Sequence, residues 1–131
     1  MRIAQRVMLF SLLNAGAVAS LPSEAHAEFY SGNELYDYCS TDKSDPVYYS
    51  KQSTCRGFIA GVVDTVNATR SLSGTASCLP SGVTLAQVTD VVMKHLRENP
   101  QYRNLSAAIL VQGAIMDAWG CRLPATGPKT K

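Results

Sequence analysis

The chain has 131 residues, of which 46% are hydrophobic and 17% are charged, and its formal net charge at pH 7 is +2. Nucleic-acid grooves and polybasic membrane patches need concentrated positive charge, so a nearly neutral chain without a Lys/Arg cluster favours neither. The length and composition indicate one small domain whose partner is a small molecule or another protein.

The N-terminal residues predict an export signal. Arg2 and Arg6 precede an apolar stretch of secretory length, and Ala25 and Ala27 hold the two small-residue positions that a signal peptidase reads. The apolar stretch is shorter than the roughly 20 residues that span a bilayer. We therefore expect residues 1–27 to be a cleaved signal peptide and the mature protein not to insert into a membrane.

The remaining residues, 28–131, are expected to form one helical domain with a short disordered tail from about residue 124. Four segments have helical patterns, and no stretch has the alternation of a strand. In chain order they are SGNELYDYC from Ser31, DPVYYSKQSTCRGFIAGVVDTVNATR from Asp45, VTLAQVTDVVMKHLRENP from Val83 and RNLSAAILVQGAIMDAWGC from Arg103. Four short helices with short connections predict a small all-α bundle with an antiparallel, up-and-down course.

Local signals mark several helix ends. Ser31 with Glu34, and Thr84 with Gln87, have the spacing of capping boxes at the starts of the first and third helices. Gly120 is expected to end the last helix, because glycine readily adopts the left-handed conformation found there.

The four cysteines, Cys39, Cys55, Cys78 and Cys121, all follow the signal. An even number in an exported chain predicts disulfides, whereas a metal site is disfavoured because there is no Cys-x-x-Cys pair and the signal is followed by a single histidine, His95. In an up-and-down bundle Cys39 and Cys55 lie at one end, and Cys78 and Cys121 at the other. We therefore favour the pairs Cys39–Cys55 and Cys78–Cys121 over the other two connectivities.

Gly57, Gly61 and Asp64 interrupt the apolar pattern of the second helix. Each glycine costs about 1 kcal/mol of helix propensity relative to alanine. Since the two glycines share one face, we expect a neighbouring backbone to approach that face closely. Asp64 lies beside the apolar stripe, where an unpaired carboxylate is costly. A salt bridge or a capping contact is therefore expected for Asp64 rather than an acid–base role.

The sequence contains no catalytic constellation. His95 is the one general base of the usual type after the signal, and no nucleophile with an orienting group accompanies it. Gly-x-Ser-x-Gly, His-Glu-x-x-His and phosphate-binding glycine loops are absent from the sequence. We therefore expect no enzymatic activity, no metal and no cofactor.

Four stretches of the chain, within residues 29–121, resemble the Rap1a/Tai family of immunity proteins. In order they are GNELYDYC, CRGFIAGVVD, CLPSGVTLAQVTDVVMKHLRENP and AAILVQGAIMDAWGC. The most specific positions are Cys55, Gly57, Phe58, Ile59, Gly61 and Asp64 in the second stretch, and Cys78, Pro80, Gly82, Val83 and Thr84 in the third. Gly120 stands where the family commonly has proline, a departure that concerns the helix end.

The resemblance implies a periplasmic, disulfide-bonded helical protein, often a homodimer, that binds and occludes a peptidoglycan amidase effector of a type VI secretion system. The alternative is a general periplasmic module that binds an envelope component or a small ligand. We expect the partner contact in the polar link of residues 70–77, for which the alternative is a merely solvated connection. The expected contact residues are Arg70, Ser71, Leu72, Ser73 and Thr75.

The mature protein is predicted to contain no free thiol. Mass spectrometry of a digest prepared without reductant should show one peptide pair joined through Cys39 and Cys55 and another through Cys78 and Cys121. A cross-linked peptide joining Cys39 to Cys78 or to Cys121 would refute the pairing, and alkylated cysteines would refute the oxidised state.

Overall fold

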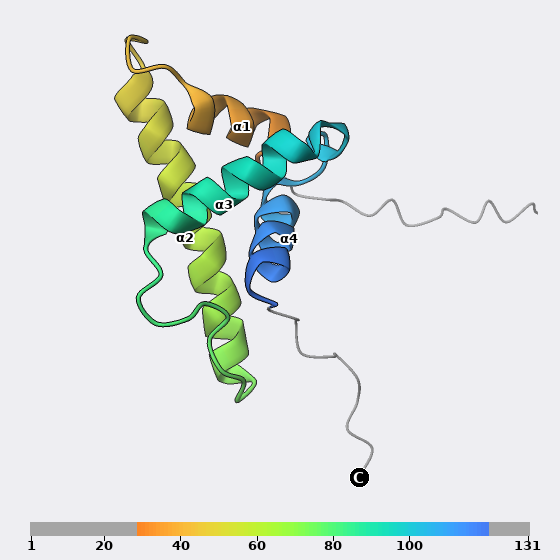
Figure 1. Cartoon of the computed structure of the whole chain (residues 1–131). Coiled ribbons are helices and arrows are strands. Elements are labelled where there is room, and N and C mark those ends of the chain that lie inside the picture. The colour runs from red at the N-terminus through yellow and green to blue at the C-terminus, as the bar shows by residue number, and fades with distance from the viewer. Residues whose placement is uncertain (1–28, 121–131) are drawn as a thin grey trace, which may run out of the picture.

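The computed structural model describes residues 29–120, and the predicted all-α fold is confirmed there (Figure 1). The elements are α1 (Gly32–Ser40), α2 (Tyr48–Leu72), α3 (Leu85–Glu98), a short 3-10 helix η1 (Pro100–Tyr102) and α4 (Ala107–Trp119). No strand occurs in this range; an isolated antiparallel bridge joins Ser31 to Ser106. The predicted signal peptide and the predicted tail lie outside the described residues.

The helices do not follow the simple up-and-down course predicted from the sequence. Figure 1 shows α3 crossing in front of α2 rather than running alongside it. The reason is the link of residues 73–84, which returns along the lower half of α2 before α3 begins. Because α3 starts beside the middle of α2 instead of at its end, it packs across that helix.

Both predicted capping boxes are present. The Ser31 hydroxyl accepts a hydrogen bond from the Glu34 backbone N–H (3.3 Å), and the Glu34 carboxylate accepts one from the Ser31 N–H (2.8 Å). These hydrogen bonds hold the pKa of Glu34 below its ordinary value, because they stabilise the charged carboxylate. Thr84 and Gln87 make the same reciprocal pair at α3. Gly120 ends α4 with a φ of 67°, as expected for a left-handed cap.

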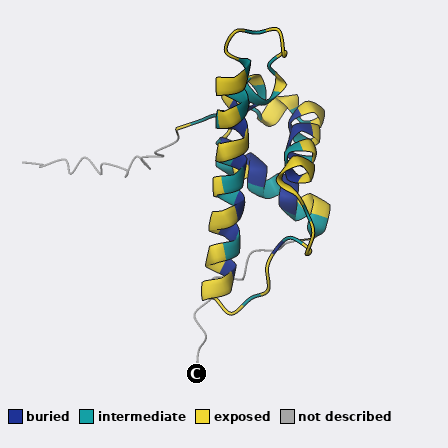
Figure 2. Cartoon of the chain, turned by 90° about the vertical axis from the view of Figure 1, so that its left-hand side faces the viewer, coloured by how far each residue is buried: buried dark blue, intermediate teal, exposed yellow. Residues whose placement is uncertain are grey.

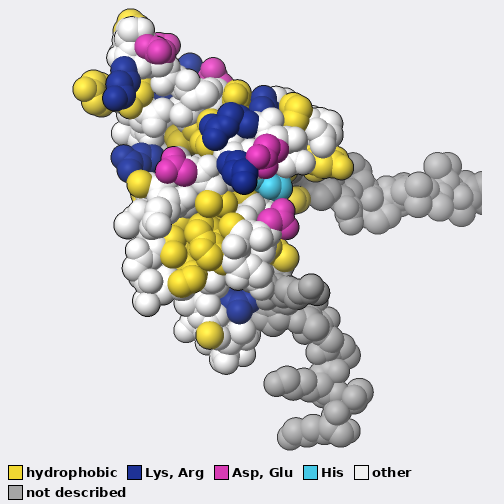
Figure 3. Space-filling model, viewed as in Figure 1, with side chains coloured by type: hydrophobic (Ala, Val, Ile, Leu, Met, Phe, Trp, Pro, Cys, Tyr) yellow, Lys and Arg dark blue, Asp and Glu magenta, His cyan; other side chains and the backbone are white. Residues whose placement is uncertain are grey.

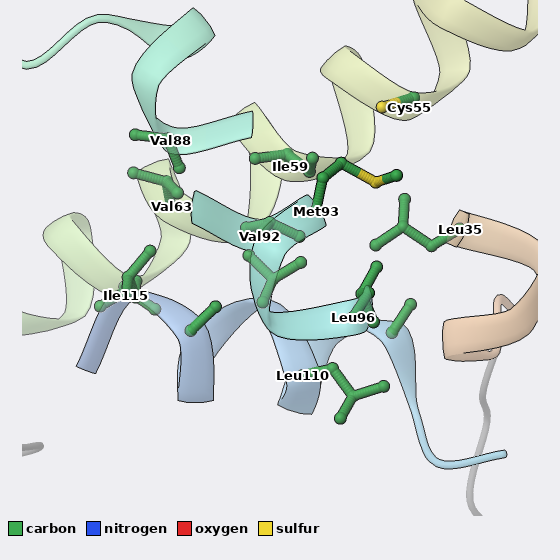
Figure 4. Packing of buried hydrophobic residues seen from close by; sticks show 14 of the residues in the cluster. Leu35, Cys55, Ile59, Val63, Val88, Val92, Met93, Leu96, Leu110 and Ile115 are labelled. Atoms are coloured by element: carbon green, nitrogen blue, oxygen red, sulfur yellow. The ribbon is translucent and has the colours of Figure 1, made fainter. Parts of the chain in front are cut away.

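The core takes side chains from all four α-helices, which converge in Figure 4. Figure 2 shows that the buried residues lie on the inner sides of the helices and the exposed ones on the outer sides. The most completely buried large side chains are Leu35, Ile59, Val92, Leu96, Val111 and Ile115. Burying a side chain of this size stabilises the fold by about 1.5–3 kcal/mol, so each helix depends on the others for its stability.

The predicted Cys39–Cys55 disulfide is confirmed and joins the end of α1 to the first half of α2, with the two Cα atoms 5.2 Å apart. Cys55 is fully buried, so the bridge is part of the core. Cys78 is also buried. Its predicted partner, Cys121, lies outside the described residues, and the second pairing therefore stays a prediction.

Backbone hydrogen bonds join the start of α1 to the connection between α3 and α4. The backbone N–H groups of Gly32 and Asn33 donate to the carbonyl oxygens of Leu105 (2.8 Å) and Arg103 (2.7 Å). A Cβ atom at Gly32 would lie 2.9 Å from the Arg103 carbonyl oxygen, closer than real Cβ contacts come. Gly32 is therefore the glycine that permits a close backbone approach.

Replacing both Cys39 and Cys55 by alanine is expected to lower the free energy of unfolding by about 3 kcal/mol, because the bridge closes a loop of 16 residues in the unfolded chain. Chemical denaturation followed by circular dichroism measures this change. An unchanged denaturation midpoint would show that the bridge does not stabilise the fold.

Candidate interaction site

Gly57 and Gly61 face solvent, and the prediction that they allow close helix packing is wrong. A Cβ atom built at either glycine meets nothing within 4 Å. The stripe of α2 that packs inward contains Cys55, Ile59 and Val63, on the other side of the helix. The four-residue spacing of Gly57 and Gly61 correctly predicted that they share one face of α2. That face, however, is the outer one, which faces solvent.

The two glycines instead line a shallow hollow between α2 and α4. Its volume is about 460 Å³. The residues that line it are Gly57, Phe58, Gly61, Val62, Thr65, Ala108 and Gln112. Because glycine has no side chain, nothing projects from α2 into the hollow at these two positions. None of the lining residues is charged.

A second hollow, of about 490 Å³, lies between α2, the α2–α3 link and the start of α3. Its walls are mostly apolar, from Ala60, Val63, Leu79, Pro80, Val83, Leu85 and Val88, with Asp64, Asn67, Ser77, Ser81 and Thr84 as the polar members. We call it the Asp64 hollow. Figure 3 shows hydrophobic side chains gathered over the part of α2 that lies below α3 in that view.

Asn67 holds the link in place beside this hollow. Its side-chain oxygen accepts hydrogen bonds from the Cys78 backbone N–H (3.1 Å) and from the Ser77 hydroxyl (3.2 Å). Further along, Gly82 has a φ of 87°, and Thr84 then caps α3. The motif residues of the link therefore shape the turn that leads into α3 and form one wall of the hollow.

Asp64 lies at the rim of this hollow and is exposed. Within residues 29–120 its carboxylate has no ion pair and no hydrogen bond, so the salt bridge or capping contact predicted from the sequence is not found. It is also the one charged residue among the described residues that line the hollow. The arrangement presents an unpaired carboxylate beside an apolar surface.

The predicted contact link differs from expectation at its start. Arg70, Ser71 and Leu72 form the last turn of α2, and Arg70 is buried, with its Nε donating to the Ala76 carbonyl oxygen (2.8 Å). The Arg70 carbonyl oxygen accepts from the Thr75 N–H (2.8 Å), which closes the turn. Arg70 therefore holds the turn together from a buried position, and its role as a contact residue stays a prediction.

Leu72 is 91% exposed at the C-terminal end of α2. The turn that follows has the hydrogen bonds of a Schellman motif, with Gly74 at a φ of 67° donating to the Ser71 carbonyl oxygen (3.0 Å). Ser71 and Ser73 are exposed and Thr75 is half-buried. The contact role of these residues stays a prediction, but the turn that carries them is ordered by its own hydrogen bonds.

His95 does not stand alone on the surface. Its Nδ1 lies 3.7 Å from a carboxylate oxygen of Asp117, so it faces α4. In the described part of the chain, no group of three or more His, Cys, Asp or Glu side chains is placed to hold a metal ion. None of the helices between residues 29 and 120 is both long and apolar enough to cross a membrane.

The fold and the two hollows beside α2 define a small, disulfide-linked helical domain that offers surfaces for binding. The family model of the Rap1a immunity proteins matches residues 31–121, a range that contains all four α-helices and both hollows. The chain therefore belongs to the Rap1a immunity protein family, as its resemblance to that family predicted. No curated protein and no solved structure matches the chain.

Gly61→Ala and Gly32→Ala are expected to change stability in opposite directions. At Gly61 the added methyl group meets nothing within 4 Å, and alanine favours the helix by about 0.5–1 kcal/mol. At Gly32 the methyl group would press on the Arg103 carbonyl, which should cost about 1–3 kcal/mol. Thermal melts of the two variants measure both changes, and a destabilised Gly61→Ala protein would restore the close-packing interpretation.

Proposed function

We propose that this protein is a periplasmic immunity protein that binds a peptidoglycan amidase effector of a type VI secretion system and blocks its catalytic cleft. The observation that carries the proposal is the match to the Rap1a immunity proteins over residues 31–121. Inhibition by occlusion needs a surface that fits the effector, and it needs no reacting group on the inhibitor.

The rigidity of the domain supports this mode of action. Its core joins all four α-helices, and the Cys39–Cys55 bridge ties α1 to α2. A surface that is already ordered loses less conformational entropy when it binds, so more of the contact energy appears as affinity. Leu72, exposed on a hydrogen-bonded turn, is the apolar side chain that we expect to enter the cleft.

The expected location agrees with the chemistry of the chain. Disulfides persist in oxidising compartments such as the bacterial periplasm, and the Cys39–Cys55 bridge fits that setting. A signal peptide in residues 1–27 would deliver the protein to the compartment that contains peptidoglycan. We also propose the homodimer that the resemblance implies, and sedimentation of the purified protein measures this oligomeric state.

A second candidate function is favoured by the size of the hollows. Volumes of about 490 Å³ and about 460 Å³ lie within the range of small-molecule sites, which is roughly 300–1,000 Å³. A general periplasmic module that binds an envelope component or a small ligand would use one of these hollows. Such a module would leave peptidoglycan cleavage by an amidase unaffected, which separates the two candidates.

Mixing the purified mature protein with a cognate amidase effector of a type VI secretion system is expected to abolish peptidoglycan cleavage at a molar ratio of about one to one. The protein alone should release no cleavage products. Liquid chromatography of the released stem peptides measures the activity. Undiminished cleavage at saturating protein would contradict the immunity function.

Leu72→Ser tests the contact assigned to the end of α2 and should weaken inhibition by roughly tenfold, the effect of removing one apolar anchor. Tyr49→Ser is the matched control, because Tyr49 is 83% exposed near the opposite end of the same helix. Equal inhibition by the two variants would remove Leu72 from the contact and leave the immunity function standing.

A further inference from the structure

The Asp64 hollow has a chemistry that selects its occupant. Its walls are formed mainly by aliphatic side chains, and its one charge is the carboxylate of Asp64 at the rim. The link that forms one wall is fixed through Asn67, whose oxygen holds both Ser77 and Cys78. The hollow is therefore present before any partner arrives.

The fold supplies no counter-charge to Asp64 from within residues 29–120. The positions three and four residues away along α2, where helical ion pairs form, hold Ala60, Gly61, Asn67 and Ala68. The described lining residues from the link and from α3 contain no Lys, Arg or His. The carboxylate of Asp64 therefore lies beside apolar walls without an ion-pair partner in this part of the chain.

These features exclude most kinds of occupant. An entirely apolar side chain would cover the carboxylate without pairing it, and desolvating an unpaired charge is costly. An acidic group would be repelled. An arginine side chain satisfies both parts of the hollow, because its aliphatic stem covers apolar surface while its guanidinium group reaches a carboxylate with two parallel hydrogen bonds.

The position of Asp64 on α2 also connects it to the exposed end of that helix. Asp64, Ala68 and Leu72 follow one another at intervals of four residues, so they lie along one side of α2. All three are exposed. A protein that covers Leu72 along this side of the helix would therefore also reach Asp64.

We propose that the Asp64 hollow receives an arginine side chain of the effector, with its stem against the aliphatic walls and its guanidinium group paired with Asp64. This inference rests on the proposed function, since the occupant is part of the amidase effector that the protein would inhibit. It assigns the recognition of the effector to the side of α2 from Asp64 to Leu72.

Asp64→Asn tests the charge with almost no change of shape. Calorimetric titration with the cognate amidase effector should show binding roughly tenfold or more weaker than for the wild type. The salt dependence of the affinity should also decrease, because one ion pair is lost. Asp90→Asn is the matched control: Asp90 is an exposed carboxylate on α3 outside the hollow, and this variant should bind like the wild type.

Two further variants test the occupant. Ala60→Phe fills the hollow and leaves the charge in place, so it should also weaken binding. A chain ending at Cys121 lacks Arg122, Lys129 and Lys131, the basic residues that follow the last cysteine, and should bind the effector and respond to Asp64→Asn as the full chain does. If truncation abolishes the effect of Asp64→Asn, the hollow holds the tail of its own chain and the proposal is overturned.

The outcomes separate this inference from the proposed function. Wild-type protein that does not bind the effector would overturn the proposed function and, with it, the inference. Wild-type binding together with equal affinities for Asp64→Asn and Asp90→Asn would overturn the inference alone. Circular dichroism of each variant verifies that the domain remains folded, which is expected for Asp64→Asn because Asp64 has no partner in the described part of the chain.

Discussion

Burial of the inner side of α2 is the constraint on which the rest of the structure depends. Cys55 and Ile59 are fully shielded from solvent, and Val63 and Val66 are nearly so. A helix of 25 residues with such a stripe is unstable in water unless other elements cover it. α1, α3 and α4 provide the cover, and the Cys39–Cys55 bridge holds α1 against the first half of α2.

The same constraint leaves the outer side of α2 free for recognition. Gly57 and Gly61 contribute nothing to the packing of the described domain, and each lowers helix stability relative to alanine. Asp64 likewise has no intramolecular partner in this part of the chain. Residues that add little to folding and yet shape the surface are the ones expected to serve a partner, and α2 therefore acts as core element and as candidate recognition element at once.

The α2–α3 link converts this exposed side into a hollow. Arg70 and the Schellman turn reverse the chain at the end of α2, and Asn67 then fixes the link against the helix. As a result α3 begins beside the middle of α2 and crosses it (Figure 1). In an up-and-down bundle α3 would instead begin at the end of α2, where the link starts.

The sequence by itself determined the features that arise between near neighbours. Capping at Ser31 and Thr84 depends on a residue three positions away, and the Cys39–Cys55 pair joins two consecutive helices. The tertiary structure alone decided which side of α2 faces solvent at Gly61 and whether Arg70 is buried. Both depend on where α3 and the link cross α2. That crossing is set by the packing of segments that are far apart in the chain, and the spacing of residues along one helix carries no information about it.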